Sequence, residues 1–225
     1  MIPTYRTPAD LPASLPVFPL AGAILLPRAI LPLHIFEPRY LEMFDDALRG
    51  DRLVGIVQPA GDGGMTGSPQ GRSIGLRDVG CAGRIKSYQE LDDGRLMVAL
   101  GGVARFRPRS EIQLDRRYRT FDVAFDDFAD DLSAGLGEDA VDRDGLLEVV
   151  KRFLTHRGLQ GDLDAMRRSG TEQLVNGLCL ASPFTSEERQ ALIEAKTLAD
   201  RAKLLVTLAE MEIASGQTGG GQRMQ

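Results

Sequence analysis

The sequence predicts an α+β protein in which a β-rich half precedes a helical half. Up to about residue 126, short apolar runs are separated by proline, glycine and aspartate, which is typical of strands and turns. Beyond that point the apolar residues recur at helical spacing. We therefore expect a flexible N-terminus over residues 1–13, a β-rich subdomain over 14–126, a helical bundle subdomain over 127–214 and a disordered tail over 215–225.

The β-rich half is expected to contain one helix among its strands. Pro38 fits the first position of a helix, where its missing N–H is not needed, and Gly50 is placed to end that helix. The turn Asp92-Asp93-Gly94 joins two strands in a predicted hairpin. Strands are predicted over residues 17–20 and 30–35, both as buried strands, and over 53–57, 81–91, 95–100, 103–106 and 118–125.

The helical half begins with an apolar stripe that runs from Leu146 to Leu154. Further helices are predicted over residues 171–180, 186–196 and 198–214. Thr185 and Glu188 have the spacing of a capping box, in which each side chain accepts a hydrogen bond from an amide near the helix start. The apolar face of the last helix can pack within the bundle or against a second copy of the chain, so a homo-oligomer stays open.

Composition and charge exclude several classes of protein. The chain has 225 residues and a formal net charge of -5, which disfavours general binding to nucleic acids. The apolar run over residues 15–36 contains four prolines, which would leave backbone groups unpaired in lipid, so we expect no membrane span. Residues 1–10 contain no apolar signal sequence, and the expected compartment is the cytoplasm.

No metal or cofactor site is expected. Cys81 and Cys179 are far apart and neither belongs to a C-x-x-C pair. Two buried thiols are the favoured interpretation, with a disulfide between them left open. The segment Asp142-Arg143-Asp144-Gly145 resembles part of a calcium loop, but the first and twelfth positions would then be Ala140 and Lys151, which offer no carboxylate.

Four segments resemble the N-terminal domain of Lon proteases. The most specific is LPVFPLAGAILLPRAILPLHIFEPRYLEMFDDAL at residues 15–48. IGLRDVGCAGRI at 74–85 and DDGRLMVALGGVARFR at 92–107 are similar to the central strands and hairpin of that family. SPFTSEERQALIEAKTLADRAKLLVTLAEMEI at 182–213 is similar to its last two helices. The resemblance covers roughly residues 14–214.

This resemblance implies a PUA-like β-barrel followed by a helical bundle. It also implies a module that catches unfolded or tagged polypeptides, with a separate ATP-dependent protease as a candidate partner. In full Lon proteins an ATPase module and a protease module follow. Here no lysine follows a glycine, so the Walker A motif is absent. We expect a stand-alone, non-catalytic binding module with no cofactor.

The segment over residues 21–30 is the first candidate for the polypeptide-binding surface. It is apolar, yet its glycine and its proline make it loop-like, and unfolded chains are captured by exposed apolar surface or by a free sheet edge. The alternative is a buried crossover, which is favoured for Ile24 and Leu25. Phe36 and Tyr40 match family motif positions, although their spacing also suits a core. The candidate binding residues are Arg28, Ile30, Leu26, Phe36 and Tyr40.

RNA binding is the leading alternative function. PUA-like folds can bind RNA, and the chain has a basic stretch from Arg105 to Arg119. Glu111 and Asp115 interrupt it, and no aromatic platform for base stacking accompanies it. The arginines of this stretch are Arg105, Arg107, Arg109, Arg116, Arg117 and Arg119.

A serine hydrolase is the third function considered. Gly71-Arg72-Ser73-Ile74-Gly75 matches the G-x-S-x-G pattern, which activates its serine only in a turn between a strand and a helix. Here a glycine-rich loop precedes the motif and a strand is predicted after it. The two histidines have other interpretations, His34 as a hydrogen-bonded structural residue and His156 as a partner of a helix dipole. We expect no catalytic residue.

Overall fold

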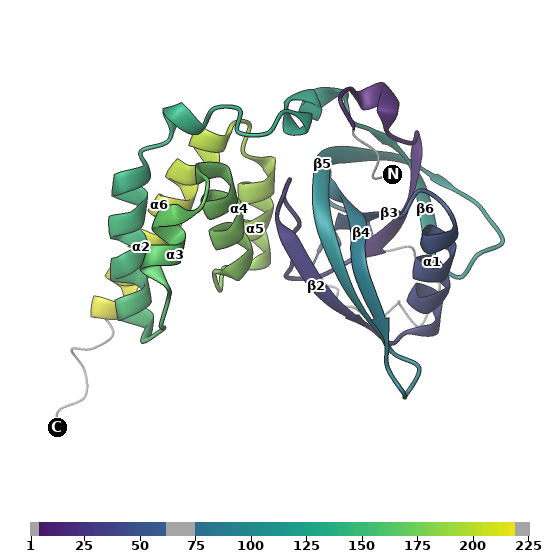
Figure 1. Ribbon diagram of the computed structural model, residues 1–225, viewed down its shortest axis with the longest axis horizontal. Helices are drawn as coiled ribbons and strands as arrows, with labels where there is room; N and C mark the ends of the chain where they lie inside the picture. The colour runs from purple at the N-terminus through teal and green to yellow at the C-terminus, as the bar shows by residue number, and fades with distance from the viewer. Residues whose placement is uncertain (1–4, 62–74, 219–225) are drawn as a thin grey trace.

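A barrel and a helical bundle lie side by side in the protein (Figure 1). The computed structural model describes residues 5–61 and 75–218. The barrel is one six-stranded sheet with the order β2-β5-β4-β3-β1-β6, which a further β5–β6 pairing closes. The predicted α+β class is therefore confirmed. The strands are β1 (Ser14–Pro19), β2 (Ile30–Ile35), β3 (Leu53–Val57), β4 (Gly80–Glu90), β5 (Leu96–Ile112) and β6 (Arg119–Ala124).

Strand β5 is the long strand to which the rest of the barrel is attached. Its first half pairs with β2 and with β4, and its second half pairs with β6. The sequence predicted two separate strands here, over residues 95–100 and 103–106. Instead Gly101 and Gly102 lie inside β5, where a Cβ atom at Gly102 would collide with the carbonyl oxygen of Leu26. The absence of a side chain at Gly102 thus lets the loop between β1 and β2, which contains Leu26, approach strand β5.

Helix α1 (Pro38–Arg49) packs on the barrel and buries Tyr40, Met43, Phe44 and Ala47. Both its start at Pro38 and its end before Gly50 agree with the prediction. At the N-terminus, residues 8–10 form the short helix η1 (Pro8–Asp10), and Leu11 is buried in the barrel. The expectation of a flexible segment up to residue 13 is therefore wrong for this part, because Leu11 has apolar partners in the barrel core.

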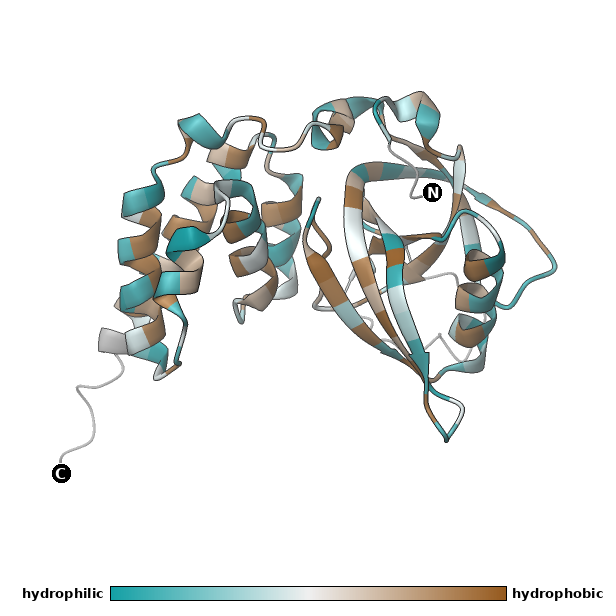
Figure 2. Ribbon diagram, in the orientation of Figure 1, coloured by the Kyte–Doolittle hydropathy of each residue, from teal (hydrophilic) through white to brown (hydrophobic). Residues whose placement is uncertain are grey.

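The helical half contains two short turns and five α-helices within the described residues. Apolar residues face the interior of this bundle (Figure 2). The predicted capping box is confirmed, since the Glu188 amide donates to the Thr185 hydroxyl and the Thr185 amide donates to the Glu188 carboxylate. The elements are η2 (Asp126–Leu132), η3 (Glu138–Ala140), α2 (Arg143–Arg157), α3 (Leu163–Arg168), α4 (Thr171–Ala181), α5 (Ser186–Glu194) and α6 (Leu198–Thr218).

The barrel and the bundle share one apolar core. Leu25 and Leu100 from the barrel belong to the same buried cluster as Val175 and Leu192 from the bundle. Both thiols are buried and free, as expected, so Cys81 and Cys179 form no disulfide. Because the core is continuous, the two subdomains are held together by more than the linker between them.

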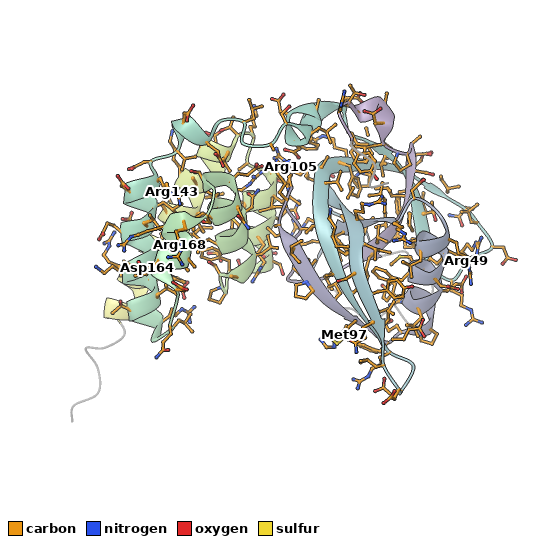
Figure 3. All side chains as sticks on the ribbon, in the orientation of Figure 1. Arg49, Met97, Arg105, Arg143, Asp164 and Arg168 are labelled. Atoms are coloured by element: carbon orange, nitrogen blue, oxygen red, sulfur yellow. The ribbon has the colours of Figure 1, made fainter. Side chains whose placement is uncertain are left out.

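A buried arginine also joins the subdomains. The Arg105 guanidinium on β5 donates to both carboxylate oxygens of Asp131, which lies in η2, at 2.8 Å each. It also donates to the carbonyl oxygens of Ile193 and Ala195 at the end of α5. Figure 3 shows Arg105 between the two subdomains. One side chain thus connects the barrel, the linker and the bundle.

The substitution Asp131→Asn is expected to lower the free energy of unfolding by about 3 kcal/mol, because it leaves the buried Arg105 charge without its carboxylate. The nearby Asp127, whose ion pair with Arg107 is solvent-exposed, provides the matched control. Asp127→Asn is expected to cost less than about 1 kcal/mol. Urea denaturation of both variants measures the difference, and equal losses would show that the Arg105 pair is not needed.

Candidate functional site

Strand β2 lies at the end of the sheet order and leaves one backbone edge unpaired. Within the described residues it pairs with β5 alone, in register from Ile30 opposite Gly101 to Ile35 opposite Leu96. Pro32 lies in the middle of β2, and a proline without an N–H is tolerated there because the edge carries no further strand. The edge is therefore available for hydrogen bonding to another extended chain.

The side chains of β2 alternate between the core and solvent. Leu31, Leu33 and Ile35 face the barrel core opposite Leu100, Val98 and Leu96. Ile30, Pro32 and His34 point the other way and are exposed. The predicted strand 30–35 has the right bounds, but its interpretation as a wholly buried strand is wrong, because it is covered on one face only.

Large apolar side chains are exposed along this face. Ile30 is 55% exposed, Phe36 directly after β2 is 58% exposed, and Met97 on β5 is 39% exposed opposite His34. Figure 2 shows apolar residues along β2, which lies on the side of the barrel toward the bundle, and Figure 3 labels Met97 near the hairpin that joins β4 to β5. We call the set Ile30, Pro32, His34, Phe36 and Met97 the β2 surface.

Two of the predicted binding residues are in the core instead. Leu26 is completely buried, and so are Ile24 and Leu25, for which a buried crossover was favoured. Tyr40 is 6% exposed and its ring lies 4.2 Å from that of Phe18, centroid to centroid. Leu26 and Tyr40 therefore cannot touch a polypeptide on this surface, because the barrel core already surrounds them.

Arg28 is half-buried and already has partners in the bundle. Its guanidinium forms an ion pair with Glu172 on α4 and donates to the carbonyl oxygen of Asp131. The residue adopts a left-handed backbone with φ of 63°. The position of Arg28 thus fits a link between subdomains better than a contact with an incoming chain.

The two histidines lie on different elements. His34 is exposed on β2, and its interpretation as a hydrogen-bonded structural residue stays a prediction. His156 lies in the last turn of α2, where a helix dipole favours positive charge, as predicted. The G-x-S-x-G serine, Ser73, lies outside the described residues. Burial raises the pKa of the Cys179 thiol to about 12, which makes it a poor nucleophile.

The basic stretch is largely neutralised by carboxylates. Within the described residues, five of its six arginines form ion pairs. Such pairing leaves little free positive charge for a phosphate backbone. The pairs are Arg105 with Asp131, Arg107 with Asp127, Arg116 with Asp46, Arg117 with Glu42 and Arg119 with Glu111.

The described residues contain neither a metal-binding cluster nor a membrane-spanning helix. Over 5–61 and 75–218, no three His, Cys, Asp or Glu side chains are grouped so as to hold a metal ion. In the same part of the chain, no helix combines the length and the apolar character needed to cross a bilayer.

Comparison with known families decides which family this fold represents. The model of the ATP-dependent protease La (LON) substrate-binding domain matches residues 14–210. The chain belongs to the Lon substrate-binding domain family.

Two solved structures share the fold. The Lon N-terminal domain protein from Xanthomonas campestris covers 86% of this chain and 97% of its own, with a TM-score of 0.57 and 22% identity. The N-terminal domain of Mycobacterium avium complex Lon protease covers 88% and 98%, with a TM-score of 0.64 and 16% identity.

Curated relatives of this Lon-family chain are much longer proteins. Lon protease of Desulfosudis oleivorans is 30% identical over 117 residues, which are 51% of this chain and 14% of that protein. Lon protease 2 of Thermus thermophilus is 26% identical over 210 residues, which are 92% of this chain and 25% of that protein. The chain thus spans a quarter or less of the length of these two relatives.

The distinction between core and surface in the β2 region predicts different effects of two alanine substitutions. Leu26→Ala is expected to lower the free energy of unfolding by about 3 kcal/mol, because it leaves a cavity in the Lon-type barrel. Ile30→Ala, at an exposed site, is expected to change it by less than about 1 kcal/mol. Urea denaturation measures both values. A small effect of Leu26→Ala would mean that the crossover loop is not packed as described.

Proposed function

We propose that this chain is a non-catalytic module that binds unfolded or tagged polypeptides through the β2 surface. Its family supports a role in substrate recognition. The observation that carries the proposal is that Ile30, Phe36 and Met97 are exposed along β2 and its neighbour β5, beside a strand edge that pairs with no further strand in the described residues. An ATP-dependent protease is the partner to which such a module would deliver its substrates.

The edge of β2 would supply contacts that do not depend on the substrate's sequence. An extended polypeptide can add to an open sheet edge through main-chain hydrogen bonds, which every residue except proline can make. Unfolded chains expose such backbone groups, whereas folded proteins have paired them already. Pairing with β2 would therefore select for the unfolded state.

The exposed side chains of the β2 surface would supply most of the affinity. Covering a large apolar side chain contributes about 2 kcal/mol. Ile30 and Phe36 are each more than half exposed, and Met97 adds a flexible contact that adapts to different side chains. Because ordering an unfolded chain opposes binding, the expected affinity is weak, on the order of micromolar. Weak binding suits a module that must release its substrate.

The other two functions have less support. RNA binding rested on the Arg105–Arg119 stretch, whose arginines are mostly paired with carboxylates. A hydrolase of the G-x-S-x-G type requires its serine in a turn between a strand and a helix, whereas the first helix or strand after Ser73 among the described residues is strand β4. We infer that the chain binds its polypeptide without covalent chemistry.

Polypeptide binding should depend on Phe36 and Ile30. The double substitution Ile30→Ser with Phe36→Ser is expected to weaken binding of a labelled, reduced and alkylated polypeptide by about two to three orders of magnitude, because two apolar contacts of about 2 kcal/mol each are lost. Fluorescence anisotropy measures the affinity. Leu114→Ser is the matched control, since Leu114 is 55% exposed but lies outside the β2 surface.

A natively folded protein and a short RNA serve as parallel probes in the same titration. The proposal fails if the double variant binds as tightly as the unchanged chain. It also fails if the RNA binds more tightly than the unfolded polypeptide and loses affinity steeply with salt.

Short peptides with N-methyl groups on alternate amides test the edge pairing, since they keep the side chains but lose backbone donors. Unchanged affinity of the methylated peptides would exclude strand addition.

A further inference from the structure

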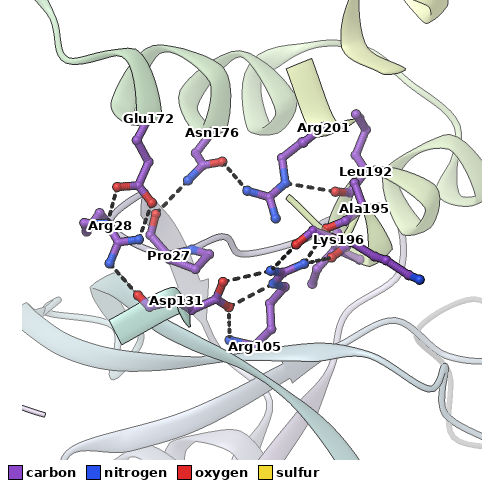
Figure 4. Close-up of polar contacts among 11 residues, drawn as sticks. Pro27, Arg28, Arg105, Asp131, Glu172, Asn176, Leu192, Ala195, Lys196 and Arg201 are labelled. Carbon is purple, nitrogen blue, oxygen red and sulfur yellow. Dashed lines mark hydrogen bonds and ion pairs between the residues drawn. The ribbon is translucent and has the colours of Figure 1, made fainter. Parts of the chain in front are cut away.

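The joint between barrel and bundle contains one positive charge more than it can pair. Arg105 and Arg201 are both buried, at 4% and 3% exposure. The Arg201 Nε donates to the carbonyl oxygen of Leu192 and its Nη1 donates to the Asn176 side chain. The buried Nη2 atom of Arg201 has no hydrogen-bond partner in the described structure. Figure 4 shows this nitrogen directed toward the space between Pro27 and Arg105.

The carboxylates of the joint are already engaged by other groups. Both Asp131 oxygens accept from Arg105. Glu172 accepts from Arg28 and from the Gly135 amide. Burial and the nearby Arg105 guanidinium lower the pKa of Arg201. A buried cation without an anionic partner is costly, and so Arg201 is the group that an added anion would stabilise most.

A pocket of about 300 Å³ lies beside this unpaired guanidinium. The start of the long helix α6 also lines it, at Leu198 and Ala199, whose amides precede the first intrahelical hydrogen bonds. The exposed Lys196 lies at the rim. Three carboxylates also line the pocket: Asp130, which is exposed, and Asp131 and Glu172, which are paired with Arg105 and Arg28. We call this space the joint pocket.

We propose that the joint pocket binds a small oxyanion, a phosphate or a carboxylate group, between Arg201, Lys196 and the first turn of α6. A guanidinium presents its N–H groups in a plane that matches two oxygens of such an anion. The amides at a helix start add donors and a favourable dipole. The source is either a free small anion or the C-terminal carboxylate of a polypeptide.

A bound oxyanion would lie between the two subdomains, because residues of both line the joint pocket. Arg105 belongs to the barrel strand β5, whereas Leu198 and Arg201 belong to helix α6. The anion would therefore tie the bundle to the barrel and raise the melting temperature of the whole chain. This site is separate from the β2 surface, and its existence does not require that polypeptides bind there.

Inorganic phosphate is the first probe, titrated against chloride at equal ionic strength. We expect saturable shifts of the Leu198 and Ala199 amide signals in nuclear magnetic resonance spectra, together with a higher melting temperature. Lys196→Glu is expected to weaken phosphate binding about fivefold, since it reverses a rim charge. Lys203→Glu is the matched control, because Lys203 is exposed on α6 and does not line the joint pocket.

Arg201→Gln tests the central contact and is expected to weaken binding about tenfold or more. If that variant does not fold, the test is the comparison of phosphate affinity between the Lys196→Glu variant and the Lys203→Glu control. Unsaturable shifts spread over the surface, or equal losses of phosphate affinity in the two lysine variants, would overturn the proposal.

A short peptide and its C-terminal amide then identify the source of the anion. Competition with phosphate by the free acid alone indicates a polypeptide terminus, and no competition by either indicates a free anion.

Discussion

The guanidinium of Arg105 is the interaction on which the arrangement of this protein depends. This side chain extends from β5 and donates hydrogen bonds to both carboxylate oxygens of Asp131 in η2. It also donates to two carbonyl oxygens at the end of α5. A charge this deeply buried is tolerated only when such partners are all present, so its position is compatible with few arrangements of the two subdomains. The shared apolar core supplies most of the cohesion, while the ion pair selects one orientation. The exposed face of β2 then lies on the side toward the bundle (Figure 1).

Local signals in the sequence predicted much of the barrel. Pro38 and Gly50 delimit α1, and residues 53–57 were predicted with the bounds that β3 has. These features depend on neighbours in the chain. The burial of Arg105 depends instead on Asp131, a carboxylate partner 26 residues away in the chain. The sequence indicated only a basic stretch from Arg105 to Arg119, whereas the structure buries this arginine.

The candidate site was predictable only in part for the same reason. The sequence pointed to the region around β2, and two of its candidate residues, Ile30 and Phe36, are exposed. Leu26 and Tyr40 carry equally apolar side chains, yet the barrel covers both. Which side of the chain faces the core is set by pairing with β5, whose register the sequence does not reveal. The unpaired Nη2 of Arg201 gave no signal in the sequence at all, since it arises where three distant segments meet.

The β2 surface and the joint pocket are neighbours along the chain. Arg28 lines the joint pocket, and only Ala29 separates it from the first residue of β2. The central claim concerns β2 itself, and hydrogen–deuterium exchange of its backbone amides tests that claim most directly. With an excess of a reduced and alkylated polypeptide, the account predicts slower amide exchange in β2 (Ile30–Ile35). It predicts unchanged exchange in β6 (Arg119–Ala124), which is paired with strands on both sides. Unchanged exchange in β2, with slowing elsewhere in the chain, would contradict it.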